Sequence, residues 1–249
     1  MEALSAVFTI DGIWLLVIGA SIAGLVRGFS GFGTAMVYLP LAGQVIPPFE
    51  ALTTMIIMDM FGPIPIVPRA LRDGHPRDVL RLGMGMVVTL PLGVLLLSVI
   101  AAEVFRYGVS FVSLALLGLL VAGVRYNKPL KNHMMFAAGG LAGFLGGSVG
   151  LAGPPVIMLY MASPHPAEVI RANTLLFLIL ADISMIVVFQ IGGHLVVSAI
   201  FTGIILVVPY LLANLAGAAI FKPGRERVYR TVAYLIIAVS ALSGLPLFD

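Results

Sequence analysis

The chain consists of long apolar runs separated by short polar stretches. Several runs approach 20 residues, the length that crosses the roughly 30 Å hydrocarbon core of a bilayer as a helix. The alternating ten-residue segments of a membrane β-barrel do not occur. The pattern therefore predicts an all-α polytopic membrane protein. The expected apolar segments are 13–26, 34–47, 51–68, 82–101, 107–124, 134–146, 154–162, 170–190, 195–221 and 230–247.

The first apolar stretch, residues 13–46, is too long for one straight span. As a single helix it would measure about 50 Å. Gly28, Gly31 and Gly33 interrupt it about midway, so we expect two arms of about equal length joined by a glycine tip. Non-helical backbone at membrane depth survives only against protein or a wet cavity, which makes the tip a candidate site. The alternative is that these glycines only let helices pack closely.

Basic residues gather in three of the loops between the apolar segments. By the positive-inside rule these three loops are cytoplasmic. The loop at 192–194 carries no Lys or Arg and is expected outside, as are both termini. The basic loops contain Arg69, Arg72, Arg77 and Arg81; Arg125, Lys128 and Lys131; and Lys222, Arg225, Arg227 and Arg230.

Several landmarks recur at a nearly constant offset along the chain. The pairs are Gly28 and Gly147, Gly31 and Gly150, Gly74-His75 and Gly193-His194, each 119 residues apart, with Ala51 and Ala172 121 apart and Pro91 and Pro209 118 apart. The first Gly-His loop lies among arginines and the second does not. The pattern predicts two inverted repeats, 12–125 and 132–248, in a single membrane domain. Each repeat would be a broken or re-entrant helical hairpin plus three transmembrane helices, with the two tips meeting near the bilayer middle.

The second arm of each predicted hairpin offers a helix N-terminus to an anion. It begins at Gly33-Thr34 in one repeat and at Gly153 in the other. A helix N-terminus leaves free N–H groups and carries about half a positive charge. Arg27 adds a full charge, unless it pairs with Asp59 or reaches a membrane surface. The candidate substrate-binding residues are Arg27, Gly28, Ser30, Gly31, Gly33, Thr34, Ser148, Gly150, Thr53, Thr54, Asn173 and Thr174. For the last four, capping of helix ends is the alternative.

Two carboxylates interrupt the apolar spans that follow the hairpins. Asp59 and Asp182 are 123 residues apart. Carboxylates inside a membrane often carry protons in transporters. We therefore expect these residues to serve in proton coupling. The alternative is a structural hydrogen bond to backbone or, for Asp59, a contact with Arg27.

Composition excludes several classes of function. Of 249 residues, 60% are hydrophobic, 10% are charged and none is cysteine, which excludes thiolate catalysis and Cys-bound metals. The pI of about 9.4 reflects membrane orientation rather than nucleic-acid binding. No nucleotide-binding loop, GxSxG elbow or HExxH spacing occurs, and the four histidines lie in or near loops. We expect no catalytic residue, no metal, no cofactor and no nucleic acid. The sequence leaves undecided whether the protein forms a homodimer, because Gly139-Gly140 and Gly143 could pack within or between subunits.

Four segments resemble those of the TauE/SafE sulfite-exporter (TSUP) family of bacterial membrane proteins. They are GFSGFGTAMVYLPL from Gly28, EALTT from Glu50, GGSVGLAGPPVIMLY from Gly146 and IRANT from Ile170. The resemblance covers about residues 13–245. It implies transport, usually outward, of sulfite, thiosulfate, sulfoacetate or other organosulfonates, and a location in the bacterial inner membrane.

Together with this resemblance, the sequence predicts a secondary transporter and not an enzyme. The resemblance implies export of small sulfur-containing anions, and the helix breaks predict that the anion binds at the membrane midplane with coupling to protons. An anion channel of the same architecture is the alternative. An integral membrane enzyme would need a polar catalytic cluster, which the sequence does not display.

Overall fold

The computed structural model describes residues 11–62, 66–122, 130–221 and 226–245. Every regular element within these ranges is a helix, and no strand occurs among them. The helices are α2 (Ile13–Ser30), α3 (Thr34–Ala42), α4 (Pro48–Met60), α5 (Val67–Asp73), α6 (Pro76–Val99), α7 (Ala102–Ala122), α8 (Asn132–Val149), α9 (Gly153–Met161), α10 (Ala167–Ile191), α11 (Val197–Ile220) and α12 (Glu226–Ser243). The all-helical prediction is confirmed.

Five helices are long and apolar enough to cross a membrane: α2, α6, α7, α10 and α11. Large apolar side chains on their outer faces are exposed, as on α6, where Val88 is 71% and Val99 is 73% exposed. Apolar exposure of this extent fits contact with lipid tails rather than water. The chain is therefore a multi-pass membrane protein. The predicted termini and the basic residues at 125, 128, 222 and 225 lie outside the described residues.

Contacts divide the chain into two units. Unit 1 comprises 1–62, 101–117 and 194–249, and unit 2 comprises 63–100 and 118–193. Each unit therefore takes segments from both predicted repeats. The boundaries 12–125 and 132–248, and the opposite orientation of the two repeats, stay predictions.

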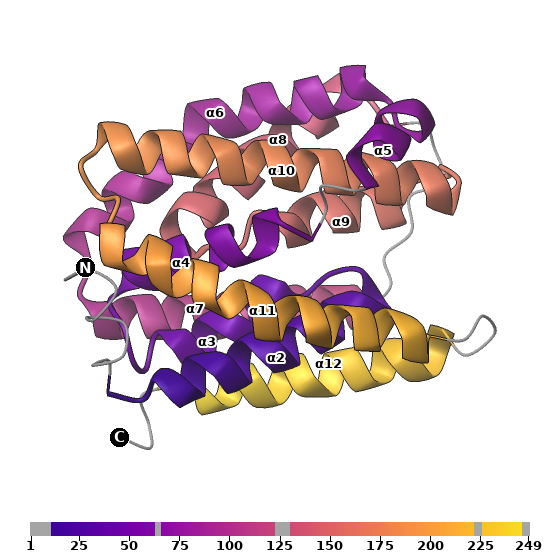
Figure 1. The fold of residues 1–249 in the computed structure, drawn as a ribbon. Coiled ribbons are helices and arrows are strands. Elements are labelled where there is room, and N and C mark those ends of the chain that lie inside the picture. The colour runs from indigo at the N-terminus through magenta and orange to yellow at the C-terminus, as the bar shows by residue number, and fades with distance from the viewer. Residues whose placement is uncertain (1–10, 63–65, 123–129, 222–225, 246–249) are drawn as a thin grey trace. The chain divides into compact units, whose positions relative to one another are not determined.

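Unit 1 is built on close contact between α2 and α11. A Cβ on Gly24 would collide with the backbone of Tyr210, and one on Gly28 would collide with the backbone of Asn214. A Cβ on Gly217 of α11 would collide with the backbone of Leu25 in the same way. Small residues allow such approach between membrane helices. Helix α12 also packs on α2 and on α3 (Figure 1).

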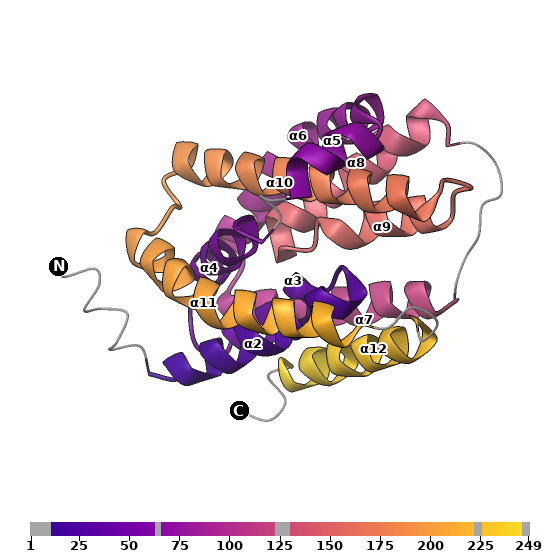
Figure 2. The ribbon, with the colours of Figure 1, turned by 45° about the vertical axis from the view of Figure 1, so that its right-hand side comes forward.

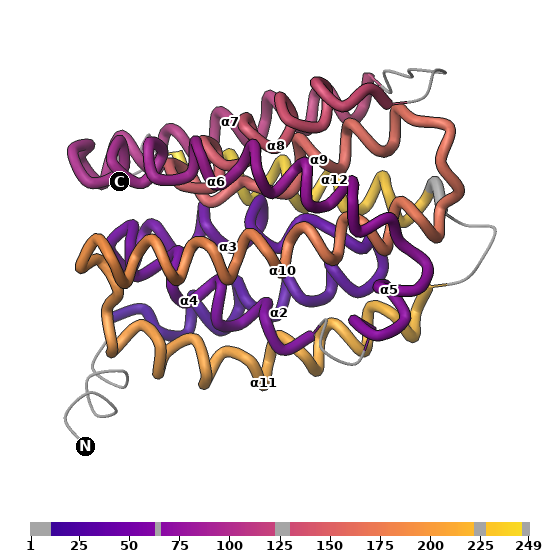
Figure 3. The backbone as a smooth tube through the Cα atoms, turned by 90° about the horizontal axis from the view of Figure 1, so that it is seen from above, coloured from indigo at the N-terminus to yellow at the C-terminus, as the bar shows by residue number. Residues whose placement is uncertain are grey.

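Unit 2 is built on the corresponding contact between α6 and α8 (Figure 3). Gly139, Gly143 and Gly147 lie four residues apart on α8, so they share one face of that helix. A Cβ on any of them would collide with the backbone of α6. This face of α8 therefore serves packing within the chain. Helix α9 packs against α10 in the same unit (Figure 2).

Two length predictions were wrong. Helices α3 and α9 have 9 residues each, or about 14 Å, so the second arm of each hairpin is about half as long as the first. The span predicted at 51–68 is not one helix, because α4 ends at Met60 and a separate α5 begins at Val67. Residues 63–65 between them lie outside the described part.

Candidate functional site

The predicted break after α2 is present. Helix α2 ends at Ser30, and Gly31 and Gly33 follow with φ of 81° and 100°. These left-handed conformations suit glycine because it has no Cβ. Helix α3 begins directly afterwards at Thr34, without a side-chain cap. The first N–H groups of α3 are therefore left for other partners.

A second break separates α8 from α9. Gly150 has φ 75° and ends α8, and its N–H donates to the carbonyl of Gly146 at 2.9 Å. Helix α9 begins at Gly153 and has proline in its first turn, a position where the missing donor is not needed. The two predicted helix breaks are thus both found, 119 residues apart. The Gly-His landmarks differ, since Gly74 is extended and Gly193 is left-handed.

Four polar side chains from four helices meet beside the first break, within unit 1. Thr34 Oγ1 on α3 lies 3.1 Å from the hydroxyl of Tyr210 on α11 and 3.5 Å from Asp59 Oδ1 on α4. The Tyr210 hydroxyl donates to that carboxylate oxygen. Arg27 Nη2 on α2 is 3.8 Å from Asp59 Oδ2. We call Arg27, Thr34, Asp59 and Tyr210 the tip cluster.

The charges of the tip cluster are largely removed from solvent. The side chains of Arg27 and Asp59 are 13% and 14% exposed. Charged side chains that are largely removed from water inside a membrane protein cost free energy unless they pair with an opposite charge or serve a function. The ion-pair alternative considered for Arg27 is therefore realised. Since 3.8 Å exceeds the 2.7–2.9 Å or so of a charge-assisted hydrogen bond, this contact is not a short one.

Each unit also joins its short helix to the next helix through a tyrosine. In unit 1, Tyr38 on α3 and Thr54 on α4 share a hydrogen bond of 2.9 Å. In unit 2, Asn173 on α10 donates to the Tyr160 hydroxyl on α9 at 3.0 Å. All four side chains are buried. Thr54 and Asn173 therefore hold the short helices in place, a role that sequence analysis considered only as helix capping or path lining.

The other predicted site residues are distributed over both units. The hydroxyls of Ser30, Thr53 and Ser148 bond to backbone carbonyls one turn earlier, at 2.6, 2.7 and 2.7 Å. Gly28 faces α11 and serves close packing. Thr174 is buried, and its hydroxyl has no hydrogen-bond partner among the described residues. Asp182 is half-buried in α10.

A family model decides the assignment. The model described as sulfite exporter TauE/SafE matches residues 16–244, nearly the whole chain. The chain belongs to the TauE/SafE sulfite exporter family. The resemblance inferred from its glycine motifs is thereby confirmed. Comparison with curated proteins found no match, and comparison with solved structures found none.

Membership explains the general function but not the site. TauE/SafE proteins are membrane transporters of the sulfite-exporter type, so the assignment is consistent with transport rather than enzymatic catalysis. Sequence analysis did not include Tyr210 among the site residues of this TauE/SafE chain. A tyrosine in an apolar span is common at membrane interfaces, and only the fold brings Tyr210 to Asp59, 151 residues away in sequence.

Proposed function

We propose that this TauE/SafE protein is a secondary transporter that exports small sulfur-containing anions, such as sulfite, sulfoacetate or another organosulfonate. The tip cluster is the observation that carries the proposal. It combines an arginine with an N-terminus of α3 that has no side-chain cap, in a largely buried setting. Both features favour a small oxyanion over a cation or a neutral solute.

In this proposal the substrate binds at Arg27 and at the first turn of α3. A sulfonate or sulfite group has three oxygens, enough to accept from the guanidinium, from backbone N–H groups and from the hydroxyl of Thr34. The open tip at Gly31, where a Cβ would meet nothing within 4 Å, leaves room for approach to the backbone. In unit 2, the N-terminus of α9 with Ser148 and Gly150 is the corresponding predicted anion-binding element.

Asp59 couples the proton in this proposal. As a carboxylate it competes with the substrate for Arg27, which lies 3.8 Å away. Once protonated it no longer competes, so proton and anion bind together. Asp182 in α10 is the other predicted coupling residue. Alternating access would follow from rocking of one repeat against the other, as in transporters built from inverted repeats.

The proposed setting is the bacterial inner membrane with both termini in the periplasm. Arg69, Arg72, Arg77 and Arg81 support a cytoplasmic position for the segment from α5 to the start of α6. The opposite end of α10, at 192–194, has no Lys or Arg and would be periplasmic.

Transport in proteoliposomes tests the proposal. Purified protein should concentrate a radiolabelled organosulfonate against its gradient, and R27A should reduce uptake at least tenfold. R27A leaves Asp59 buried without this partner, which can destabilise the fold by about 3–5 kcal/mol. The R27A/D59N double variant removes both charges and therefore tests anion binding without that destabilisation. R69A is the matched control, since Arg69 forms an exposed pair with Asp73.

Two outcomes would contradict the proposal in different ways. Uptake by the double variant equal to that of the native chain would remove Arg27 from the site. Flux that only dissipates gradients and never concentrates the anion would instead identify a channel with the same helix tips.

A further inference from the structure

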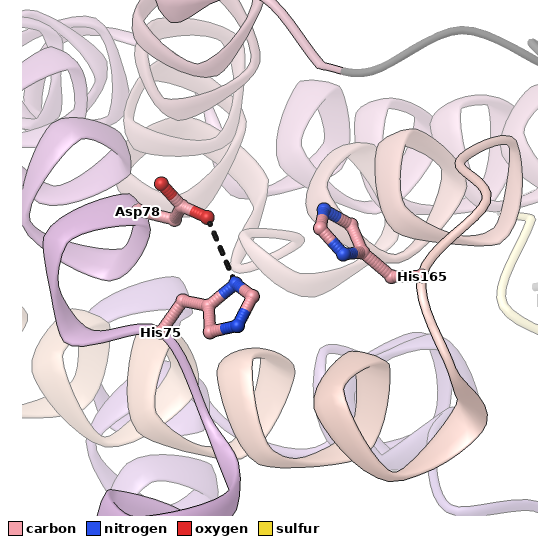
Figure 4. Close-up of side chains that lie close together, drawn as sticks. All are labelled: His75, Asp78 and His165. Atoms are coloured by element: carbon pink, nitrogen blue, oxygen red, sulfur yellow. Dashed lines mark ion pairs between the residues drawn. The ribbon is translucent and has the colours of Figure 1, made fainter.

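Three side chains with metal-binding atoms meet in unit 2 (Figure 4). His75 immediately precedes α6, Asp78 lies in the first turn of α6, and His165 lies in the connection between α9 and α10. One ligand atom from each residue can be chosen so that all lie within 4.8 Å of one another. Sequence analysis expected no metal because the histidines show no ligand spacing. The fold joins residues that are 90 positions apart.

The geometry points to a binding site for a divalent transition-metal ion, with zinc as the best fit, formed by His75, Asp78 and His165. Zinc lies about 2.0–2.2 Å from nitrogen and oxygen ligands in tetrahedral sites, so two of its ligand atoms are about 3.4 Å apart. His75 Nδ1 and Asp78 Oδ2 are 3.5 Å apart. These two atoms already have the separation that a shared ion requires.

His165 completes the set by a small movement of its side chain. Its ring and that of His75 have centroids 5.5 Å apart and planes inclined by 78°. The rings are therefore not stacked face to face, and two imidazoles that share an ion present their edges to it. His165 is half-buried and its connection carries no regular element. Since the chosen atoms lie within 4.8 Å of one another, each separation has to shorten by at most about 1.4 Å to reach the tetrahedral value.

Hydrogen bonds of the kind that orient metal ligands surround the cluster. Arg81 Nη1 donates to Asp78 Oδ1 at 2.9 Å, which leaves the other carboxylate oxygen toward His75. The backbone N–H of His75 donates to Asn173 Oδ1 at 2.6 Å. Asn173 in turn donates to Tyr160 on α9. The backbone of His75 is thus tied to α10 before any ion binds.

The ligand set selects the class of ion. Two imidazoles and one carboxylate without a thiolate suit zinc and neighbouring first-row ions, whereas magnesium and calcium prefer oxygen ligands alone. Three protein ligands leave a coordination position for water. The positive charge of Arg81 beside Asp78 opposes the ion, so affinity is lower than at a closed four-ligand site. A bound ion would fasten the connection between α9 and α10 to the start of α6.

A local alternative needs no metal. His75 and Asp78 are three residues apart at the start of a helix, and a His–carboxylate pair can form there on its own. In that case His165 would be only a neighbour. The effect of replacing His165 therefore distinguishes a metal site from a local pair of His75 and Asp78.

Zinc titration of the whole protein tests the inference. Protein without a polyhistidine tag, dialysed against EDTA and then against buffer, is titrated with ZnCl₂ by calorimetry. We expect one saturable site per chain, with affinity at least tenfold weaker in H75A and in H165A. H133A is the matched control because His133 is exposed in the first turn of α8, and it should bind as the native chain does.

A second measurement keeps the test independent of folding defects. Zinc should raise the thermal denaturation midpoint of the native chain and of H133A, and should not raise that of H165A, once gel filtration shows that H165A remains monodisperse. Binding by H165A equal to that of the native chain would overturn the inference. Absence of saturable binding to the native chain at submillimolar zinc would do so as well.

Discussion

Gly31 and Gly150, 119 residues apart, end their helices in nearly the same left-handed conformation, with φ, ψ of 81°, 3° and 75°, 11°. Each is followed within three residues by a short apolar helix of 9 residues. The repeated glycine motif thus corresponds to a repeated backbone feature. The helix breaks predicted within these apolar stretches depend on this left-handed conformation.

Substitution at Gly31 should isolate the cost of that conformation. A Cβ there would meet nothing within 4 Å, so G31A should destabilise by about 1–2 kcal/mol through backbone strain alone. G118A is the matched control, because Gly118 also has open space but lies within helix α7, where alanine is favoured by up to about 1 kcal/mol. Unfolding free energies in SDS titrations would measure both. Equal effects would show that the break does not need a left-handed residue.

Adjacent glycines on α8 should respond oppositely to alanine. A Cβ on Gly139 would collide with the backbone of Leu82, whereas one on Gly140 would have its nearest neighbour, Thr89 Cγ2, at 3.7 Å. G139A should therefore destabilise by about 1–3 kcal/mol, and G140A should be neutral or slightly stabilising. Denaturation midpoints in detergent, followed by gel filtration after heating, would compare them. A larger loss in G140A would contradict the packing of α8 on α6 described above.

Removal of two buried tyrosine hydroxyls should have unequal costs. Y210F deletes a donor to the Asp59 carboxylate and the partner of Thr34, which should cost about 1.5–3 kcal/mol because the acceptor is charged. Y38F deletes a hydrogen bond between neutral groups, to Thr54, and should cost about 0.5–1.5 kcal/mol. The same SDS titration measures the difference. If Y38F were the more damaging change, Asp59 would not be the group that Tyr210 stabilises.

Organosulfonate binding should tighten as pH falls if Asp59 competes with the anion for Arg27. The sulfonate group stays ionised across the range, so the change reports the protein. Equilibrium binding of a radiolabelled sulfonate to the purified protein at a series of pH values would measure the change. D59N should bind independently of pH, and D182N should keep the native dependence. Loss of the pH dependence in D182N alone would assign the coupling to Asp182 instead.

Labelling of single cysteines should establish the orientation. The chain contains no cysteine, so no background has to be removed. R72C, in α5, should be protected from a membrane-impermeant maleimide in cells with an intact inner membrane, and Q190C, near the end of α10, should react. Both native side chains are exposed. The reverse pattern would invert the topology that the positive-inside rule predicts.

Local features were predictable from the sequence, and tertiary ones were not. An apolar stretch too long for one span, with three glycines near its middle, was sufficient to locate the break at Gly31. The length of α3 was not predictable, because apolar residues continue to Ile46. The helix nevertheless ends at Ala42, where the N–H groups of Gln44 and Val45 turn to carbonyls three residues earlier.

The composition of the tip cluster was only partly predictable. Arg27 and Asp59 stood out because charges are rare inside apolar spans, and their contact is confirmed. Tyr210 and His165 were not among the predicted site residues. The partners of each residue are distant in sequence and come close only when the helices pack. No local sequence pattern predicts that packing.

The contact between Gly28 on α2 and Asn214 on α11 also has a consequence for biogenesis. At about 5–20 residues per second of translation, roughly 10–40 s separate the synthesis of these two positions. During that interval α2 is already made while its partner is still on the ribosome. Helix α2 therefore has to wait in the bilayer with its glycine face toward lipid or an insertase. Unit 2, whose segments end at residue 193, can assemble before unit 1.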